Sequence, residues 1–246
     1  AADANDNLYV TGYYQNFTEF DATQLFAQGQ SDNARFFVAY YNTSSSQWDW
    51  AKDTSGNGNS IPYQIVVEPS TNAAYIAGYS TGTEQWDSTF SSSPQSTYAG
   101  FVVKYSDSGN FIWGQNTGGN QCFGGNCGVY YNNIVLHPDG GVVVGGNFLQ
   151  TYKKQGGTIV SGQGSWDVLL LRYAENGSQI WDYHAGGADD DRLQALSVNP
   201  KGQVQFGGRH LDDMKFGTTT LLKNTSFYKY DGFIALGCVI KGETPH

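Results

Sequence analysis

The sequence predicts an all-β protein built from about four repeats, and three observations carry this prediction. Gly accounts for 32 of the 246 residues, aromatic residues for 15% and charged residues for only 14%, a composition typical of a turn-rich β protein with a neutral polar surface. Apolar segments recur in a fixed order with turn residues between them. No segment shows convincing helical periodicity, so we expect hairpins and antiparallel sheets.

The most regular segment is an apolar strand that carries a glycine. It recurs as LYVTGYY, AYIAGYS, VVVGGNF and VQFGGRH around Gly12, Gly78, Gly146 and Gly208, with spacings of 66, 68 and 62 residues. An aromatic residue follows three of these glycines eight residues later, as Phe20, Trp86 and Phe216. This regular spacing indicates an internal repeat.

Three further segments complete each repeat. One is an apolar strand that ends at Tyr40, Tyr105, Tyr173 and Leu236. The second carries a tryptophan eight residues after each of the three tyrosines, as Trp48, Trp113 and Trp181. The third is another apolar strand, which ends at Pro69, Pro138 and Pro200. Four strands in 62–68 residues match a propeller blade. The sequence therefore predicts one domain over residues 1–246, a β-propeller of about four four-stranded antiparallel blades. We expect each tryptophan to pack between neighbouring sheets.

The same segments resemble a known family. NLYVTGYY, FGTTTL, AGFVVKYSDSGNFIWGQNTGG and IVLHPDGGVVVGG are similar to the bacterial β-propeller repeats often called SBBP and to related longer-blade repeats of surface proteins. The resemblance covers nearly the whole chain. It implies a propeller-like, mostly extracellular domain, and it implies no catalytic residues.

One blade is expected to be incomplete. The first repeat begins at its glycine strand, and the last repeat has no tryptophan near Pro245. Three arrangements fit this count: four blades that close with one blade thin, part of a larger propeller, or a propeller whose missing strands another chain supplies. The chain starts without Met or a signal peptide, which we interpret as a mature, trimmed or excerpted form.

Composition and motifs exclude several classes of function. The formal net charge is −9 and the 13 Lys and Arg residues are scattered, so we expect no nucleic-acid partner. The longest apolar runs are far too short for a membrane span. Nucleophile-elbow, zinc-protease, P-loop and dinucleotide-binding motifs are absent from the sequence.

Ligand-binding candidates lie in the variable loops of about twenty residues that follow the glycine strands. Trp86, Trp166, Tyr228 and Tyr230 are candidates for stacking on sugar rings, and Asp212 for binding hydroxyl groups. Packing is the alternative for Trp166 and Tyr230, because they share one position in the repeat with Tyr98. Packing is the alternative for Trp86, because it shares its position in the repeat with Phe20 and Phe216. Asp190 and Asp212 would be the acid and base of a carbohydrate hydrolase if their separation allowed it.

The acidic run Asp189, Asp190 and Asp191 is the main candidate for a metal site, and the pair Asp212 and Asp213 is a second one. Consecutive carboxylates in a loop can bind Ca²⁺, but Ca²⁺ loops usually space their ligands at alternate positions, and a solvated loop is the alternative. We expect no other cofactor.

Cysteines and glycosylation sequons are consistent with an oxidising, extracellular environment. Cys122 and Cys127 flank a glycine-rich loop, and we expect a local disulfide between them. Cys238 is left over as a buried residue or an intermolecular bridge. Asn16, Asn42, Asn176 and Asn224 lie in N-x-S/T sequons, which are sites of glycosylation in a secreting eukaryote.

Together these patterns predict a non-catalytic, extracellular or cell-surface propeller. We expect it to act in binding, adhesion or assembly of a surface or matrix structure, with itself, other surface proteins or glycans as partners. A glycan-binding lectin is the main alternative, and a carbohydrate-active hydrolase is the third.

Overall fold

The computed structural model describes all residues except 28–32, 93–96, 119–126, 224–228 and 238–246. The described chain is all-β and contains no helix, as the sequence predicts. Consequently no described helix is available that could cross a membrane.

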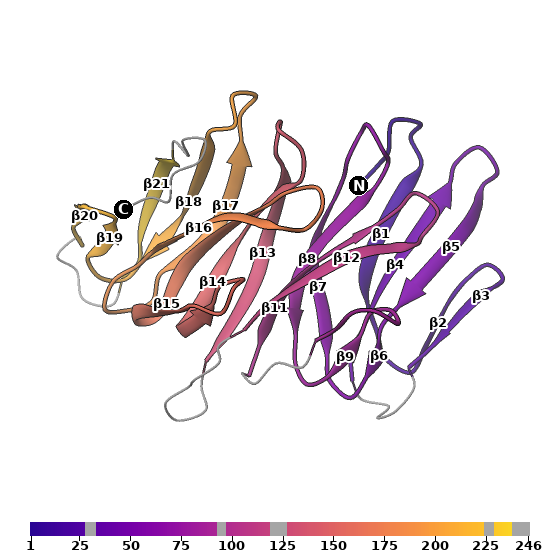
Figure 1. Cartoon of the computed structure of the whole chain (residues 1–246), viewed down its shortest axis with the longest axis horizontal. Coiled ribbons are helices and arrows are strands. Elements are labelled where there is room, and N and C mark those ends of the chain that lie inside the picture. Colours follow the sequence, from indigo (N-terminus) through magenta and orange to yellow (C-terminus); the bar gives the residue numbers. More distant parts are fainter. Residues whose placement is uncertain (28–32, 93–96, 119–126, 224–228, 238–246) are drawn as a thin grey trace.

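Four antiparallel sheets follow one another along the chain (Figure 1). The first sheet contains β1 (Leu8–Tyr14), β4 (Arg35–Asn42) and β5 (Gln47–Asp53). The second contains β7 (Ser60–Val67), β8 (Ala74–Ser80), β11 (Ala99–Tyr105) and β12 (Phe111–Gly118). The third contains β13 (Gly128–Leu136), β14 (Val142–Lys153), β15 (Ile159–Tyr173) and β16 (Gln179–Ala185). The fourth contains β17 (Arg192–Val198), β18 (Val204–His210) and β21 (Asp231–Gly237).

Short strands occupy most of the variable loops that follow the glycine strands. They are β2 (Phe17–Phe20) with β3 (Thr23–Phe26), β9 (Glu84–Gln85) and β10 (Ser91–Ser92) with β6 (Ser55–Gly56), and β19 (Met214–Phe216) with β20 (Thr219–Leu221). The third repeat differs, because β14 and β15 themselves extend into one long hairpin past a bulge near Gln150.

The repeat predicted from the sequence is confirmed by the strand register. In each sheet the glycine strand pairs with the next strand so that the repeat glycine lies opposite an apolar residue. The four pairs are Gly12 with Phe37, Gly78 with Phe101, Gly146 with Leu169, and Gly208 with Phe233. The sheets are therefore four copies of one arrangement, and positions in different sheets can be compared directly.

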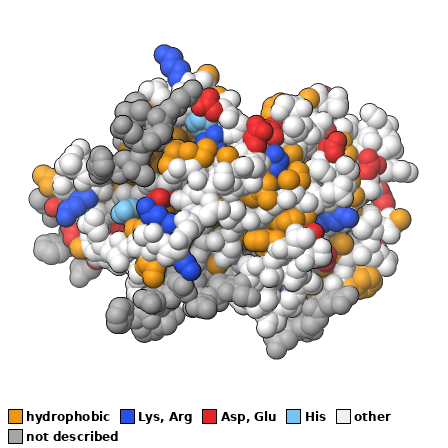
Figure 2. All heavy atoms as spheres, viewed as in Figure 1, with side chains coloured by type: hydrophobic (Ala, Val, Ile, Leu, Met, Phe, Trp, Pro, Cys, Tyr) orange, Lys and Arg blue, Asp and Glu red, His pale blue; other side chains and the backbone are white. Residues whose placement is uncertain are grey.

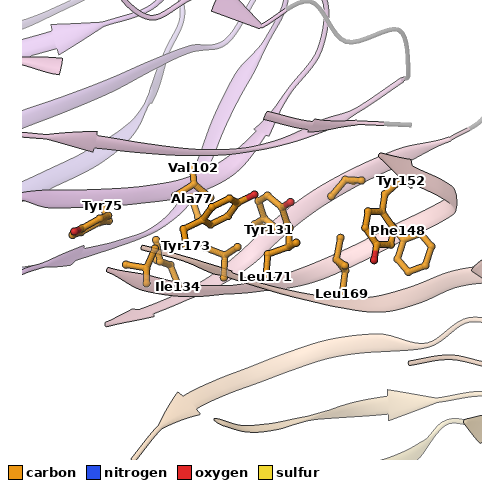
Figure 3. Close-up of a cluster of buried hydrophobic side chains, with 13 residues drawn as sticks. Tyr75, Ala77, Val102, Tyr131, Ile134, Phe148, Tyr152, Leu169, Leu171 and Tyr173 are labelled. Atoms are coloured by element: carbon orange, nitrogen blue, oxygen red, sulfur yellow. The ribbon is translucent and has the colours of Figure 1, made fainter. Parts of the chain in front are cut away.

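Neighbouring sheets pack face to face and form a row in Figure 1, with the first and fourth sheets at its opposite ends. Because side chains alternate along a strand, each inner sheet contributes to two cores. In β11, Val102 belongs to the core shared with the third sheet, whereas Phe101 and Val103 belong to the core shared with the first. Figure 3 shows the core between the second and third sheets, in which Tyr75 and Val102 face Leu171 and Tyr173.

In each of the first two sheets, one tryptophan fixes its own sheet against a turn of the next sheet. The indole N–H groups of Trp50 and Trp113 donate to backbone carbonyls of that turn, Asp107 and Glu175 respectively, both at 2.8 Å. The rings lie on the turn glycines Gly109 and Gly177, where a Cβ would be only 2.7 Å from the ring. Both glycines have a φ in the left-handed region, so the turn itself also favours glycine.

One predicted alignment is wrong. Trp48 was expected to be equivalent to Trp113, but Trp50 is the residue that pairs across its hairpin and contacts the next sheet in the same way. Two offsets of one residue cause this. Tyr41, and not Tyr40, is the register equivalent of Tyr105, and the hairpin between β4 and β5 is one residue longer than its counterpart between β11 and β12. Trp48 instead lies on the outer face of the first sheet, edge-on to Phe20 at 4.9 Å.

We predict that Trp113→Ala lowers the free energy of unfolding by about 2–4 kcal/mol, because it removes an indole between two sheets together with its hydrogen bond. Ile112→Ala, at the adjacent and 48% exposed position, is the control and should change stability by less than about 0.5 kcal/mol. Urea unfolding followed by circular dichroism measures both. Equal effects of the two substitutions would contradict the role given to Trp113.

Candidate functional site

The outer face of the fourth sheet leaves an apolar position uncovered. Ile234 in β21 is 92% exposed. Its equivalents Val38, Val102 and Leu170 are at most 2% exposed, because the next sheet covers each of them. Leu236, two residues along the same strand, is 59% exposed. Among the described residues, this face therefore has the side chains of a sheet junction but no sheet packs on it.

The edge of the fourth sheet is open as well. Within the described residues β21 pairs only with β18, whereas its equivalents β4, β11 and β15 have a partner on both sides. Beside this edge lies a largely apolar cavity of about 420 Å³. Its lining includes Trp181, Tyr183, Phe206, Phe216, Leu221 and Leu236. An open edge next to an apolar cavity can accept a strand that carries apolar side chains.

The outer face of the first sheet is the counterpart at the other end of the row. Leu8 and Val10 are 42% and 36% exposed, although their equivalents in the other three sheets are buried. Those equivalents are Ala74 and Ile76, Val142 and Val144, and Val204 and Phe206, and each is at most 4% exposed. The β2–β3 hairpin covers another part of this face, where Phe20 and Leu25 pack on Ala39. Within the described residues β1 also lacks the partner that β8, β14 and β18 find in β7, β13 and β17.

The sequence indicated these end faces only in part. The missing Pro-ended strand of the first repeat and the missing tryptophan of the last were visible as gaps in the repeat. Ile234, Leu236, Leu8 and Val10 were not singled out, because the same residue types at the same positions are buried core in the other repeats.

The predicted acidic run does not act as one set of ligands. Asp189 is exposed, and the Asp190 carboxylate accepts hydrogen bonds from Arg192 Nε and from the Tyr230 hydroxyl at 2.9 Å each. Asp191 is buried and accepts a bond from the Gly187 backbone N–H. Among the described residues no group of three or more His, Cys, Asp or Glu side chains is arranged to hold a metal ion.

The predicted ligand-binding residues do not form one site in the described structure. Trp86 is only 4% exposed and packs against Phe36 and Phe101, so it is a core residue there. Asp212 is half-buried, and its backbone carbonyl lies 2.7 Å from the His210 imidazole Nδ1. Tyr228 lies outside the described residues. No described contact joins Asp212 to Asp190, the pair considered for a hydrolase.

The remaining predictions concern covalent modification. Cys127 is buried at the start of the third sheet, but its expected partner Cys122 lies outside the described residues, so the Cys122–Cys127 disulfide stays a prediction. Cys238 also lies outside the described residues. Asn16 and Asn176 are exposed in turns, and Asn42 caps its turn by accepting the backbone N–H groups of Ser44 and Ser45. Asn224 lies outside the described residues.

Sequence reasoning missed a pair of buried carboxyl groups near the junction of the third and fourth sheets. Asp167 and Asp191 are each 1% exposed, and the Asn147 side-chain amide donates to the backbone carbonyls of both, at 3.3 and 2.9 Å. Each carboxyl group has one oxygen that receives a backbone N–H, from Gln163 or Gly187. Within the described chain the other oxygen of each, Oδ1, has no hydrogen-bond partner.

At the equivalent position between the first and second sheets, an arginine neutralises the buried carboxylate. There Arg35 takes the place of Asp167 in the repeat, and Ser60 takes the place of Asp191. Arg35 forms a fully buried ion pair with Glu84 at 3.1 Å, and the Ser60 hydroxyl donates to the same carboxylate. The acidic pair is therefore specific to one junction, and no sequence signal distinguished it from an ordinary loop carboxylate.

Burial raises the pKa of both carboxyl groups. The pKa of Asp167 rises to about 7, with the nearby charge of Asp191 adding to the effect of burial, and the pKa of Asp191 rises to about 6. An unfolded Asp has a pKa of about 4, so the folded protein holds these protons more tightly than the unfolded chain. The stabilising contribution is complete below about pH 4 and is lost as the pH rises through the folded-state pKa values.

We predict that the free energy of unfolding falls as the pH rises from 5 to 8, because these two carboxyl groups lose their protons. Asp167→Asn should remove much of this fall. The substitution should raise the free energy of unfolding at pH 8 by roughly 2–4 kcal/mol, because a neutral amide replaces a buried charge. Urea unfolding across this pH range measures it, with the exposed Asp189→Asn as control. An unchanged pH profile in Asp167→Asn would contradict the assignment.

Comparison with known proteins supplies no family for this chain. A scan against protein-family models and a search of curated proteins both give no match. The function is therefore inferred from the geometry of the sheets and their exposed surfaces.

Proposed function

We propose that this protein is a non-catalytic, propeller-type repeat module that assembles end to end with further copies of itself in an extracellular or cell-surface structure. The observation that carries the proposal is the pair of uncovered faces at the two ends of the sheet row. Each face exposes apolar residues at positions whose equivalents are buried at the three internal junctions.

The proposal treats each sheet as a propeller blade. Its support is the common strand order, the common register and the face-to-face packing of successive sheets. In the described residues the first and fourth sheets each have three strands, and both inner sheets have four. The missing positions differ: among the strands that the structure describes, none lies beside β1 in the first sheet and none beside β21 in the fourth. Contact between copies can complete both.

The two end faces are different surfaces, so the contact between copies is heterologous. A head-to-tail contact of this kind produces a ring if the rotation closes and a filament if it does not. Either product continues the stacking already present within one chain. Burying Ile234 and Leu236 in such a contact would contribute about 1.5–3 kcal/mol each.

The character of the remaining surface supports an extracellular structural role. On the face shown in Figure 2, acidic and basic side chains are spread among uncharged ones, without one continuous charged patch. The two exposed sequon turns are accessible to glycosylation. The sequence contains none of the catalytic motifs sought, and the proposal assigns no reaction to the protein.

We predict that the wild-type protein forms species larger than a monomer and that Ile234→Lys makes it monomeric. A lysine at this position would place a charge in the contact that the end faces form. Light scattering coupled to size-exclusion chromatography over a range of protein concentrations measures the mass. Ile180→Lys is the matched control, because Ile180 is also an exposed strand isoleucine, at 54%, but lies on β16, within the row.

A mixing experiment tests the head-to-tail geometry. Val10→Lys blocks the other end face, so it should also be monomeric alone. A mixture of Val10→Lys and Ile234→Lys leaves one intact end on each variant and should give dimers and nothing larger. A wild-type protein that stays monomeric at all concentrations would overturn the proposal, as would an Ile234→Lys variant that assembles normally.

A further inference from the structure

A continuous track of aromatic rings crosses the central sheets. We define the aromatic track as Tyr63, Tyr79, Tyr98, Tyr130 and Trp166. Successive ring centroids are 5.3 Å apart for Tyr98 and Tyr79, 5.9 Å for Tyr79 and Tyr63, 6.4 Å for Tyr63 and Tyr130, and 5.0 Å for Tyr130 and Trp166. The rings therefore form one chain of contacts that runs from the second sheet to the third.

The track exists because equivalent strand ends meet at one edge of the row. Tyr63 and Tyr130 lie near the starts of β7 and β13, and Tyr79 lies near the end of β8. Tyr98 directly precedes β11, and Trp166 lies in β15 where its pairing with Leu149 of β14 begins. Antiparallel pairing brings the start of one strand beside the end of its neighbour. The face-to-face stacking of the sheets then places these ends in a line.

The fourth sheet continues the track with polar groups. The Arg192 guanidinium lies 4.5 Å from the centre of the Trp166 ring and pairs with Asp190. Asp190 in turn accepts the Tyr230 hydroxyl, and Arg209 lies over the Tyr230 ring at 4.2 Å. This end therefore supplies hydrogen-bonding groups of both charges next to the rings.

The exposure of the track separates it from the cores. Tyr63 is 53% exposed and Tyr98 is 36% exposed, whereas the core tyrosines Tyr75, Tyr131 and Tyr173 are at most 2% exposed. Tyr79, Tyr130 and Trp166 are half-buried, and Arg192 lies over the Trp166 ring. The track therefore keeps part of its aromatic surface accessible, unlike the core tyrosines.

The chemistry of the track selects its ligand. A neutral sugar ring stacks its C–H face on an aromatic ring and offers hydroxyl groups to neighbouring polar side chains, and the ring separations here are comparable with the length of one hexose along a chain. Nucleic acid and other polyanions fit poorly, because the protein carries a net charge of −9 and Arg192, the cation over the Trp166 ring, is paired with Asp190. An apolar protein helix or strand would cover the exposed Tyr63 hydroxyl group without offering it a hydrogen-bond partner.

We propose that the aromatic track binds an extended, neutral polysaccharide chain, with Tyr63, Tyr130 and Trp166 as the central stacking residues. The track lies at the strand ends, away from Ile234 and Val10. Binding is therefore independent of the proposed assembly, and the two proposals can fail separately.

Native affinity electrophoresis in gels containing hydroxyethyl cellulose, xylan, glucomannan or glycol chitin tests the proposal. It uses the whole chain in the Ile234→Lys background, so that assembly does not alter mobility. We expect at least one of these polymers to retard the protein. Tyr63→Ala and Trp166→Ala should each weaken the retardation about tenfold, the loss typical of truncating a central contact residue.

Two controls separate binding from stability. Tyr63→Phe and Trp166→Phe keep an aromatic ring and should retain most of the retardation, and Phe17→Ala removes an aromatic side chain that is 45% exposed but lies outside the track. Circular dichroism melting shows whether each variant is folded. No retardation of the parent by any of the four polymers would overturn the proposal, and so would equal retardation of the folded Tyr63→Ala, Trp166→Ala and Phe17→Ala variants.

Discussion

The rest of this structure depends on the contact between a tryptophan of one sheet and a glycine turn of the next. Trp50 and Trp113 each place an indole ring on a turn that has no side chain, and each donates its N–H to a carbonyl of that turn. The ring fills the space between the sheets and the hydrogen bond fixes its position along the strands. Because the same contact is made at the first two junctions, the first three sheets are held together in the same way.

This regular stacking explains where the protein can interact. The sheet faces inside the row are buried against neighbouring sheets. Among the described residues, the two ends of the row and the strand ends therefore remain available for interaction. The row ends expose apolar residue types that the internal junctions bury, including Ile234, Leu8 and Val10. The strand ends bring aromatic residues of separate repeats into one line. In the two proposals made above, one scaffold provides a surface for further copies and a separate surface for an extended ligand.

The sequence predicted the strands well because each repeat contains independent markers in a fixed order. The glycine strands at 8–14, 74–80 and 204–210 agree with the observed bounds of β1, β8 and β18. Register was harder to predict: a hairpin one residue longer and the choice of Tyr40 in place of Tyr41 together made Trp48 look equivalent to Trp113. The aromatic track and the Asp167–Asp191 pair could not be predicted, because each joins residues of different repeats whose neighbours are set by sheet stacking and not by sequence distance. Trp86 was expected as a ligand-binding candidate because it lies in a variable loop, but its side chain is buried between two sheets.

The central claim is that the outer strands of the row are completed by contact between copies. Hydrogen–deuterium exchange of the backbone amides, followed by mass spectrometry at low and high protein concentration, tests it most directly. The account predicts that peptides covering β1 and β21 exchange more slowly at high concentration, while β11, which already pairs with β8 and β12, does not change. Exchange in β1 and β21 that is independent of concentration would contradict the account.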